Sequence, residues 1–421
     1  MSVVRFLSIC TLLSVGLLSL NVSAEENWPE FRGPNTNGQA LQGNPPTSWS
    51  EGQNVVWKTP LPGRAWSSPV VWGSQIWMTN ATEDGTELFG VCLDRNSGEV
   101  LYNEKLFDLA QPPEIHKFNS FSSPSPIIEE GRVYLSWGSY GLVCLDTNTM
   151  KQIWQRRDLE CEHYRGPGSS PIIFQNLLIQ HYDGYDYQYV IALDKNTGDT
   201  VWRTKRPKDF GTDNGDQKKA YATPIVIEVE GQLQLISPTS KGMFAYNPLD
   251  GSEIWRVTYD GFSTPCRPVY DPATGLVIIS TGFSKGVIIA VNPTGKGDVT
   301  ETHLVWEQKK SMPSKPSPLL IDGKIYVIQD QGVATCLDVK TGDPIWQQRI
   351  GGNYSASPVF AGGNIYASNE DGQTTVFRPG NKYEEVAVNQ LEDGFMASPA
   401  IIGNAMILRT RSAVYRVENR N

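Results

Sequence analysis

The sequence has 421 residues, and its 36 Lys and Arg against 45 Asp and Glu give a formal net charge of −9. This acidic balance disfavours binding to nucleic acids and electrostatic docking on an anionic membrane, because both depend on cations that meet phosphates. Thirty-nine glycines, twelve tryptophans and seventeen tyrosines suit short strands joined by tight turns.

The first residues are typical of a secretory signal peptide. Arg5 supplies a positive start, residues 6–20 are mostly apolar, and small residues at 22–24 form a cleavage site. We therefore expect residues 1–24 to be removed and the product to be exported to the periplasm or the extracellular space. No later segment approaches the roughly 20 apolar residues that span a bilayer, so we expect no membrane span.

From residue 69 onward one pattern recurs along the chain. A proline opens a short apolar strand, two further strands follow, and a fourth carries an aromatic residue. The opening prolines are Pro69, Pro126, Pro171, Pro224, Pro268, Pro318, Pro358 and Pro399. Repetition of a four-stranded unit at this spacing predicts an all-β fold, an eight-bladed β-propeller of four-stranded antiparallel blades.

A second recurring pattern begins in the turn between the third and the fourth strand of a unit. An Asp or Asn, a Gly or Met and a Trp or Tyr follow one another at a spacing of four, at Asp94/Gly98/Tyr102, Asp146/Met150/Trp154, Asp194/Gly198/Trp202, Asn247/Gly251/Trp255 and Asp338/Gly342/Trp346. The Asp accepts backbone hydrogen bonds in the turn, the Gly tolerates positive φ, and the Trp offers a large surface to bury between blades. These residues therefore build blades and require no cofactor.

The last unit, which begins at Pro399, has three strands before the sequence ends. A fourth strand is available in "NVVWKTPL", where Trp57 stands in the outer-strand context without a blade of its own before it. We infer that residues 54–59 close the ring by completing that blade, which removes exposed sheet edges. The expected organisation is an N-terminal extension over the propeller at 25–53 and a monomeric propeller at 54–421.

Five cysteines remain once the signal peptide is removed. Cys92, Cys144 and Cys336 stand two residues before the turn Asp, where other repeats carry Ala. We expect small buried thiols there, too far apart on different blades to form disulfides. Cys161 with Cys266 is the one pair left to test, and we expect it to be unpaired.

The tract Ala-x-Asp-x-x-Thr-Gly-x-x-x-Trp, clear at 192–202, resembles the repeat of pyrroloquinoline-quinone-type (quinoprotein-type) propellers. That superfamily includes quinoprotein alcohol dehydrogenases and cofactor-free members, such as the propeller lipoprotein that helps assemble outer-membrane proteins. The resemblance covers essentially residues 28–417 and implies the fold. The opening "NWPEFRGPNTNG" resembles that of exported propellers of Planctomycetes-type bacteria, which implies a source and a location rather than an activity.

The resemblance also implies what an enzyme of this kind would carry. Its dehydrogenases typically have two adjacent cysteines against the quinone and a calcium ion held by acidic and amide side chains beside an Asp base. This sequence has no adjacent cysteines, and the acidic stretch 209–217 has the spacing of no EF-hand loop. Four His make a multi-His metal centre improbable. We therefore expect no cofactor and no catalytic residues; the alternative is an alcohol or sugar dehydrogenase that uses pyrroloquinoline quinone with calcium.

The loops that lead into the innermost strands should converge at one mouth of the channel, and they are rich in cations and aromatic residues. The predicted ligand-binding residues are Arg64, Trp66, His116, Asn119, His163, Arg165, Lys219, Tyr221, Arg267, Lys315 and Tyr354. Lys117 and Tyr164 belong to the same loops, and the turn 181–189 adds His181, Asp183, Tyr185 and Asp186. Cations bind carboxylate or sulfate and aromatic faces stack on sugars, so the predicted ligand is anionic or carbohydrate. The alternative is that these are solvated loop residues.

A second class of hypothesis is protein docking, in which the propeller rim serves as a scaffold for an exported envelope protein. Ligand binding should depend on His116, His163 and Arg165 and weaken with salt. Docking should survive substitution of that group and fail when rim residues change. His303 lies in an inserted turn that we expect to project from the opposite face, outside the site.

Overall fold

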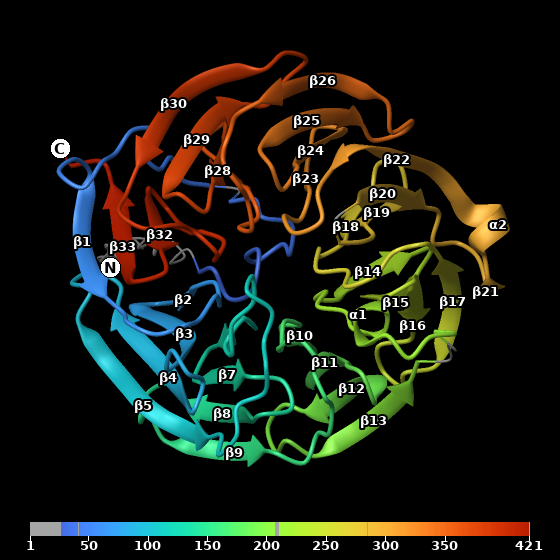
Figure 1. Cartoon of the computed structure of the whole chain (residues 1–421), viewed down its shortest axis with the longest axis horizontal. Helices are drawn as coiled ribbons and strands as arrows, with labels where there is room; N and C mark the ends of the chain where they lie inside the picture. The colour runs from blue at the N-terminus through green and yellow to red at the C-terminus, as the bar shows by residue number, and fades with distance from the viewer. Residues whose placement is uncertain (1–26, 41, 207–209, 284, 421) are drawn as a thin grey trace, which may run out of the picture.

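The computed structural model describes residues 27–40, 42–206, 210–283 and 285–420. The expected signal peptide, residues 1–24, lies outside the described residues. Within them, eight antiparallel sheets stand around a central channel like the blades of a propeller (Figure 1). The predicted eight-bladed all-β fold is confirmed.

Blades 1 to 4 each hold four strands in sequence order from the channel outwards. Blade 1 consists of β2 (Val70–Trp72), β3 (Gln75–Ala81), β4 (Glu87–Asp94) and β5 (Val100–Asp108). Blade 2 consists of β6 (Ile127–Glu129), β7 (Arg132–Ser136), β8 (Leu142–Asp146) and β9 (Gln152–Arg156). Blade 3 consists of β10 (Ile172–Phe174), β11 (Leu177–Asp183), β12 (Gln188–Asp194) and β13 (Thr200–Lys205). Blade 4 consists of β14 (Ile225–Val229), β15 (Gln232–Thr239), β16 (Gly242–Tyr246) and β17 (Glu253–Thr258).

Blades 5 to 7 follow the same order. Blade 5 consists of β18 (Val269–Asp271), β19 (Leu276–Ser280), β20 (Gly286–Val291) and β22 (Leu304–Met312). Blade 6 consists of β23 (Leu319–Ile321), β24 (Lys324–Ile328), β25 (Val333–Asp338) and β26 (Pro344–Arg349). Blade 7 consists of β27 (Val359–Ala361), β28 (Asn364–Ser368), β29 (Gln373–Arg378) and β30 (Glu384–Gln390).

Blade 8 is shared between the two ends of the propeller. Three of its strands come from the C-terminal part, namely β31 (Ala400–Ile402), β32 (Ala405–Arg409) and β33 (Ala413–Glu418). The fourth is β1 (Val55–Pro60), which pairs antiparallel with β33. The predicted closure of the ring is thus confirmed. Backbone hydrogen bonds and packing between β1 and β33 hold the two ends of the propeller together.

The inserted turn of blade 5 lies on its neighbour rather than simply projecting from a face. It contains β21 (Gly297–Asp298) and the short helix α2 (Thr300–His303). β21 pairs in parallel with β17, so blade 4 becomes a five-stranded sheet. The other helix of the described residues, α1 (Gly215–Lys218), lies in the loop before blade 4. Neither helix has the length or the apolar composition of a membrane span.

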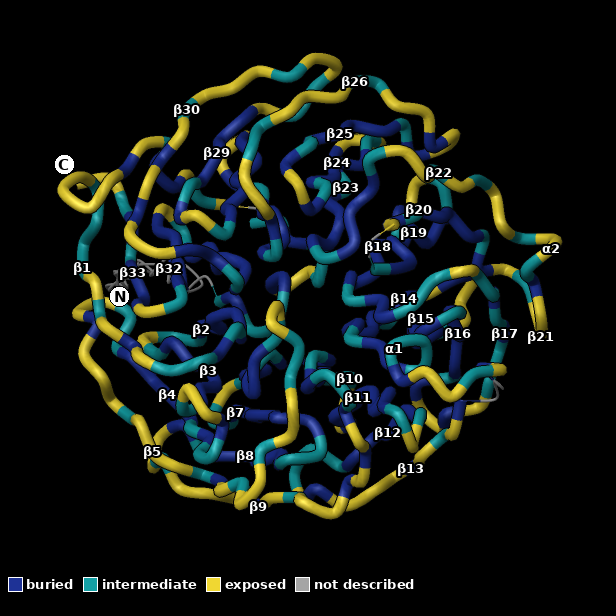
Figure 2. Tube along the Cα trace, in the orientation of Figure 1, coloured by how far each residue is buried: buried dark blue, intermediate teal, exposed yellow. Residues whose placement is uncertain are grey.

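The core lies between the blades. Apolar clusters join neighbouring sheets all around the ring, for example between blades 1 and 2, 2 and 3, and 4 and 5. The inner strands are buried on both faces, whereas outer strands such as β9 and β13 alternate exposed residues with a buried Trp (Figure 2). Alternation of this kind reflects the two-residue period of a strand with one solvent-facing side.

In blades 2, 3, 5, 6 and 8 the repeated Trp docks the blade on the next one. The indole N–H of Trp154 in blade 2 donates to the carbonyl of Lys195, which follows the turn Asp of blade 3, at 3.0 Å. Trp57, Trp202 and Trp306 make the matching bond to Arg95, Pro248 and Val339 at 3.0 to 3.1 Å. A side chain at the turn glycine would collide with that ring, because a Cβ at Gly198 would stand 2.8 Å from Trp154.

The interface between blades 1 and 2 departs from this arrangement at both of its positions. Blade 1 carries Tyr102 in place of the Trp, and blade 2 carries Met150 in place of the turn Gly. Both pack against the same apolar cluster between the two blades, and the Tyr102 ring lies 5.6 Å from that of Trp77. A smaller aromatic residue on one blade therefore accompanies a larger residue on the other.

The N-terminal segment, residues 27–40, runs across the centre of the ring (Figure 1). Trp28 exchanges two backbone hydrogen bonds with Val71 of β2, at 2.9 and 2.8 Å. Further along, the segment bonds to four more blades, at Ile128, Arg267, Pro318 and Phe360. It thus ties together blades 1, 2, 5, 6 and 7 from inside the channel.

All five cysteines of the described residues are buried and free. Cys92, Cys144 and Cys336 lie in the inter-blade core, as the repeat predicts. Cys161 and Cys266, the pair that the sequence leaves to be tested, are each a free thiol. Burial raises the pKa of the Cys161 thiol to about 12 and that of the Cys336 thiol to about 11.

Candidate functional site

A cavity of about 460 Å³ occupies the channel. The segments that lead into all eight innermost strands contribute to its wall, and Phe31 of the N-terminal segment adds one more side chain. This volume lies within the range of about 300 to 1,000 Å³ that is usual for small-molecule sites. The N-terminal segment therefore helps to form a pocket out of the channel.

A ring of hydroxyl groups encircles the cavity, and we call it the hydroxyl ring. Its members are Ser68, Ser125, Ser170, Thr223, Ser317, Ser357 and Ser398, each of which directly precedes a blade-opening proline. The backbone N–H of one member donates to the hydroxyl of the next, as from Ser68 to Ser125 at 2.9 Å and from Ser398 to Ser68 at 3.0 Å. These bonds tie seven of the eight blades to their neighbours around the channel.

Arg267 occupies the eighth position of the ring, where the repeat would place a hydroxyl. Its backbone N–H donates to Ser317, but its guanidinium turns to the carbonyl of Pro224 in blade 4, at 3.1 Å. The same guanidinium donates to the carbonyl of Phe31 and pairs with Glu30, with Nη2 2.7 Å from Oε2. The break in the ring is thus the place where the N-terminal segment is attached.

Aromatic side chains line the rest of the cavity. His116 lies edge-on to Phe283 and tilted against Phe118, with ring centroids 6.0 and 5.3 Å apart. Phe262 meets Phe283 edge-on at 6.3 Å, and Trp66 and Tyr221 also line the wall. Burial, followed by the charge of Arg165, lowers the pKa of His116 below its ordinary value. The lining is therefore more apolar and less cationic than the sequence suggests.

The cations of the lining have acidic neighbours. Lys315 forms an ion pair with Glu370, 2.8 Å from Nζ to Oε1, and its ammonium lies 4.6 Å from the centre of the Phe118 ring. Arg165 faces Asp216 and Glu114 at 3.5 and 3.4 Å, at the weak end of hydrogen-bond distances. The predicted basic ring is thus partly neutralised by carboxylates from other loops.

Six of the eleven predicted site residues line the cavity: Trp66, His116, Asn119, Arg165, Tyr221 and Lys315. Arg64 lies outside the lining and donates to the carbonyl of Asn119 at 3.1 Å, which holds that loop in place. His163, Lys219, Arg267 and Tyr354 are each at most 4% exposed and lie outside the lining. Those four residues therefore support the wall from within the protein.

His163 and Lys219 form a buried pair behind this wall. The N–H of Ser139 donates to Nε2 of His163 at 2.9 Å, so the proton of the neutral ring resides on Nδ1. Nδ1 lies 3.1 Å from Nζ of Lys219 and 3.7 Å from Sγ of Cys161. Burial, followed by the charge of Lys219, lowers the pKa of His163 well below its ordinary value, and burial also lowers the pKa of Lys219.

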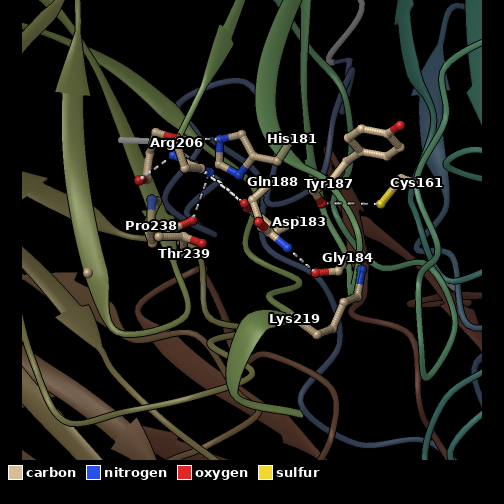
Figure 3. Close-up of polar contacts among 12 residues, drawn as sticks. Cys161, His181, Asp183, Gly184, Tyr187, Gln188, Arg206, Lys219, Pro238 and Thr239 are labelled. Carbon is tan, nitrogen blue, oxygen red and sulfur yellow. Dashed lines mark hydrogen bonds and ion pairs between the residues drawn. The ribbon is translucent and has the colours of Figure 1, made fainter. Parts of the chain in front are cut away.

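Of the predicted residues in the turn 181–189, His181 and Asp183 are buried, whereas Asp186 is exposed. Figure 3 shows Arg206 directed at Asp183, with His181 beside them. The guanidinium binds the carboxylate through two bonds of 3.0 and 2.8 Å, and both side chains are fully buried. His181 bonds to the hydroxyl of Ser237 at 2.9 Å, and burial holds its pKa well below the ordinary value. This cluster joins blade 3 to blade 4.

The cavity lining does not supply the donor set that a calcium-bound quinone needs. Calcium takes six to eight oxygen ligands, many of them carboxylates. The lining contains one carboxylate, Asp216, and it faces Arg165. Among the described residues no group of three or more His, Cys, Asp and Glu could hold a metal ion. We therefore assign no redox step to these residues.

Sequence reasoning missed the hydroxyl ring and the aromatic side chains Phe31, Phe262 and Phe283. A Ser or Thr precedes seven of the eight blade-opening prolines, but the prolines mark the blades without any use of these hydroxyls. The recurrence of this hydroxyl at the mouth of every blade but one was the available signal. Phe31 lies more than 200 residues from Arg267, and no local pattern links the two.

Sequence comparison relates the chain to outer membrane protein assembly factors. A family model described as "Outer membrane protein assembly factor BamB" matches residues 50–228 and 186–421. The outer membrane protein assembly factor BamB of Yersinia pestis is 26% identical over 227 residues, which cover 50% of this chain and 53% of that protein. The chain spans about half the length of the curated relatives it matches.

Solved structures share the propeller. BamB from Moraxella catarrhalis superposes with a TM-score of 0.60 at 12% identity, over 86% of this chain and 99% of the other. A europium-containing methanol dehydrogenase superposes with a TM-score of 0.67 at 12% identity, over 92% of this chain and 90% of the other. At such identities the likeness shows the fold alone, and the predicted resemblance to quinoprotein-type repeats is confirmed.

Proposed function

The chain belongs to the family described as outer membrane protein assembly factor BamB, and on this premise we propose that it is an exported, non-catalytic propeller that docks a partner protein in assembly of the outer membrane. The observation that carries the proposal is the match of the family model across residues 50–421. The donor set of the cavity supports it, because the lining lacks the carboxylates that the quinoprotein alternative requires.

We place the docking surface on the outer faces of blades 1 to 3. The residue before the repeated aromatic faces solvent there, because side chains alternate along a strand. These side chains are Leu101, Ile153 and Val201, which are 43%, 41% and 52% exposed. Val100 and Tyr187 are exposed on the same three blades. Exposed apolar side chains on neighbouring elements are typical of protein interfaces.

Photo-crosslinking in the source cells tests this proposal. A benzophenone amino acid at Ile153 or Val201 should capture a protein of the outer-membrane assembly apparatus, identified by mass spectrometry. Val305 on blade 5 is the matched control, since it is 49% exposed at the same repeat position. Equal capture of that partner from Val305, or capture of none from blades 2 and 3, would overturn the docking surface.

A second experiment addresses catalysis. The purified protein is mixed with pyrroloquinoline quinone and calcium, and alcohols and sugars are offered as substrates with a dye as electron acceptor. We expect no turnover above that of heat-denatured protein. Cofactor-dependent turnover would show that the protein is a dehydrogenase and would overturn the proposed scaffold function. Capture of a partner from Ile153 without turnover would support the scaffold function.

A further inference from the structure

We propose that the channel cavity is a binding site for a small carboxylate with an apolar, ring-containing body, whose carboxylate binds at the hydroxyl ring. The site is separate from the docking surface on blades 1 to 3 and does not depend on it. Three features of the cavity carry the inference: unused hydroxyl donors, buried cations without carboxylate partners and an aromatic wall.

The hydroxyl ring presents O–H groups that have no acceptor among the described residues. Each ring oxygen accepts one backbone N–H, for example that of Thr223 from Ser170 at 3.1 Å and that of Ser398 from Ser357 at 2.9 Å. By contrast, the neighbouring hydroxyls of Ser123 and Ser355 donate to side chains, at 2.6 Å each. A group that accepts several hydrogen bonds at once, as a carboxylate does, complements such a ring of donors.

Two buried guanidinium groups lie next to the ring and have no carboxylate partner among the described residues. Arg32 donates to the carbonyls of Pro318 and Pro358, the residues that follow two ring members, at 2.6 and 3.4 Å. Arg409 donates to the hydroxyl and carbonyl of Ser67, which precedes Ser68. Burial lowers the pKa of each guanidinium to about 9, a sign that its charge is costly where it lies.

An anion in the cavity would offset that cost. Electrostatic interactions are stronger in a low-dielectric interior than in water, so the two guanidinium groups, each buried behind a different part of the ring, favour a negative charge at the ring. The third buried cation near the ring, Arg267, already has its counter-ion in Glu30. The buried positive charge that lacks a counter-ion therefore belongs to Arg32 and Arg409.

The remainder of the wall favours an apolar body. Trp66, Phe262, Phe283 and Phe31 surround the space beside the ring. Each hydroxyl of a sugar brings an O–H donor that needs an acceptor, whereas a carboxylate only accepts. The one carboxylate of the lining, Asp216, already faces Arg165. The donor-rich ring therefore favours the anionic ligand over the carbohydrate, the two classes that the sequence leaves open. The volume of about 460 Å³ accommodates a molecule of one or two rings.

Calorimetric titration of the purified protein with three probes tests the proposal. The probes are 1-naphthylacetate, 1-naphthylacetamide, which has the same shape without the charge, and acetate, which has the charge without the body. We expect the naphthyl carboxylate to bind at least tenfold more tightly than either of the other two. Equal binding of carboxylate and amide, or no binding of 1-naphthylacetate, would overturn the proposal.

Two variants locate the site. Thr223→Val removes one ring hydroxyl at constant shape and should weaken 1-naphthylacetate threefold to tenfold without affecting the amide. Thr335→Val is its control, a buried Thr outside the cavity that also accepts one hydrogen bond. Phe262→Ala should weaken both naphthyl probes by the same factor. If Thr223→Val does not fold, Phe262→Ala alone tests the location of the site. Unchanged affinity of both naphthyl probes for that variant would show that they bind outside the cavity and would overturn the proposal.

Discussion

His163 and His181 are buried neutral rings, and this makes the stability of the protein depend on pH. Their pKa values lie well below the ordinary value because burial penalises the charged form. The unfolded chain therefore binds protons near pH 6.5 that the folded chain does not bind. It follows that the contribution of these two rings to stability is fully present above about pH 6.5 and is lost as the pH falls below it, by up to about 1.4 kcal/mol per pH unit for each ring.

We predict that His163→Gln removes one of these two contributions. The amide oxygen can accept the N–H of Ser139, and glutamine has no proton to gain in acid. Urea unfolding at pH 7.5 and 5.5 should show a loss of stability about 1 kcal/mol smaller in the variant than in the wild type. His303→Gln, on the insertion of blade 5, should leave the wild-type loss unchanged. An equal loss in His163→Gln would contradict the assignment of a buried neutral ring.

At the same scale, residue types in the loops indicate where a site lies but not which way each side chain points. The sequence places Lys219 and Tyr221 in one loop, two residues apart. Tyr221 lines the cavity, while Lys219 is 1% exposed and turns to His163. That choice depends on partners from other blades, which no local pattern reveals. Loop composition therefore predicted the neighbourhood of the cavity, and six of the eleven predicted residues line it.

Among the structural elements, the turn glycine and the outer-strand Trp form one joint between neighbouring blades. Gly198 and Gly131 both have positive φ, +78° and +77°, but a Cβ at Gly198 would stand 2.8 Å from Trp154 whereas one at Gly131 meets nothing within 4 Å. The two positions thus share the same backbone requirement and differ only in the contact with the next blade.

We predict that Gly198→Ala is more destabilising than Gly131→Ala. Backbone strain at positive φ should cost about 1 to 2 kcal/mol in both variants. Overpacking against the indole should add about 1 to 3 kcal/mol at Gly198 alone. Chemical unfolding measures both free energies under one condition. Equal destabilisation of the two variants would show that contact with the Trp154 ring does not restrict the side chain at the turn position.

The exception between blades 1 and 2 can be tested as a coupled pair. Tyr102→Trp should be destabilising alone, since Met150 occupies the place where other blades have a Gly to receive the indole. Met150→Gly alone leaves a void but relieves a positive φ of 59°, so we expect a smaller effect than that of Tyr102→Trp. The double variant restores the usual joint, so we expect a favourable coupling of at least 1 kcal/mol in a double-mutant cycle of unfolding free energies. If the two changes in unfolding free energy simply add, Tyr102 and Met150 do not compensate for each other, and the prediction is wrong.

For the whole molecule, the N-terminal segment stabilises the ring from within, and the buried pair of Glu30 with Arg267 is its central attachment. Burial raises the pKa of Glu30 despite the nearby guanidinium. The carboxylate therefore relies on Arg267 to remain charged inside the channel. Loss of that partner would leave an unpaired acid beneath the cavity.

We predict that Arg267→Met destabilises the protein by about 3 to 5 kcal/mol, because it leaves Glu30 buried without its partner. The double variant Glu30→Gln/Arg267→Met should regain at least 1 kcal/mol of that loss. Lys309→Met, which removes the exposed pair with Glu307, should have little effect and serves as the control. Urea unfolding measures all three variants. A double variant no more stable than Arg267→Met would contradict the role assigned to the pair.

The overall fold is the part that the sequence predicts best. Eight prolines and five recurring turns specify repetition, and a short last unit together with an unassigned Trp57 specifies the closure. The course of residues 27–40 through the channel is not predictable in this way. It depends on contacts between Trp28 and β2 and between Arg32 and blades 6 and 7, which join residues up to about 330 positions apart.

The closure of the ring also determines how the molecule responds to force. Val55 at the start of β1 pairs with Val417 near the end of β33, so both chain ends leave this join from the same side. Tension between the two ends would therefore pull β1 and β33 apart from this end. Their backbone hydrogen bonds would break one after another rather than all at once. The N-terminal segment precedes β1, so a pull on that end first meets the buried contacts of Arg32 and Arg267. The contacts of the N-terminal segment therefore protect the closure of the ring from a pull on that end.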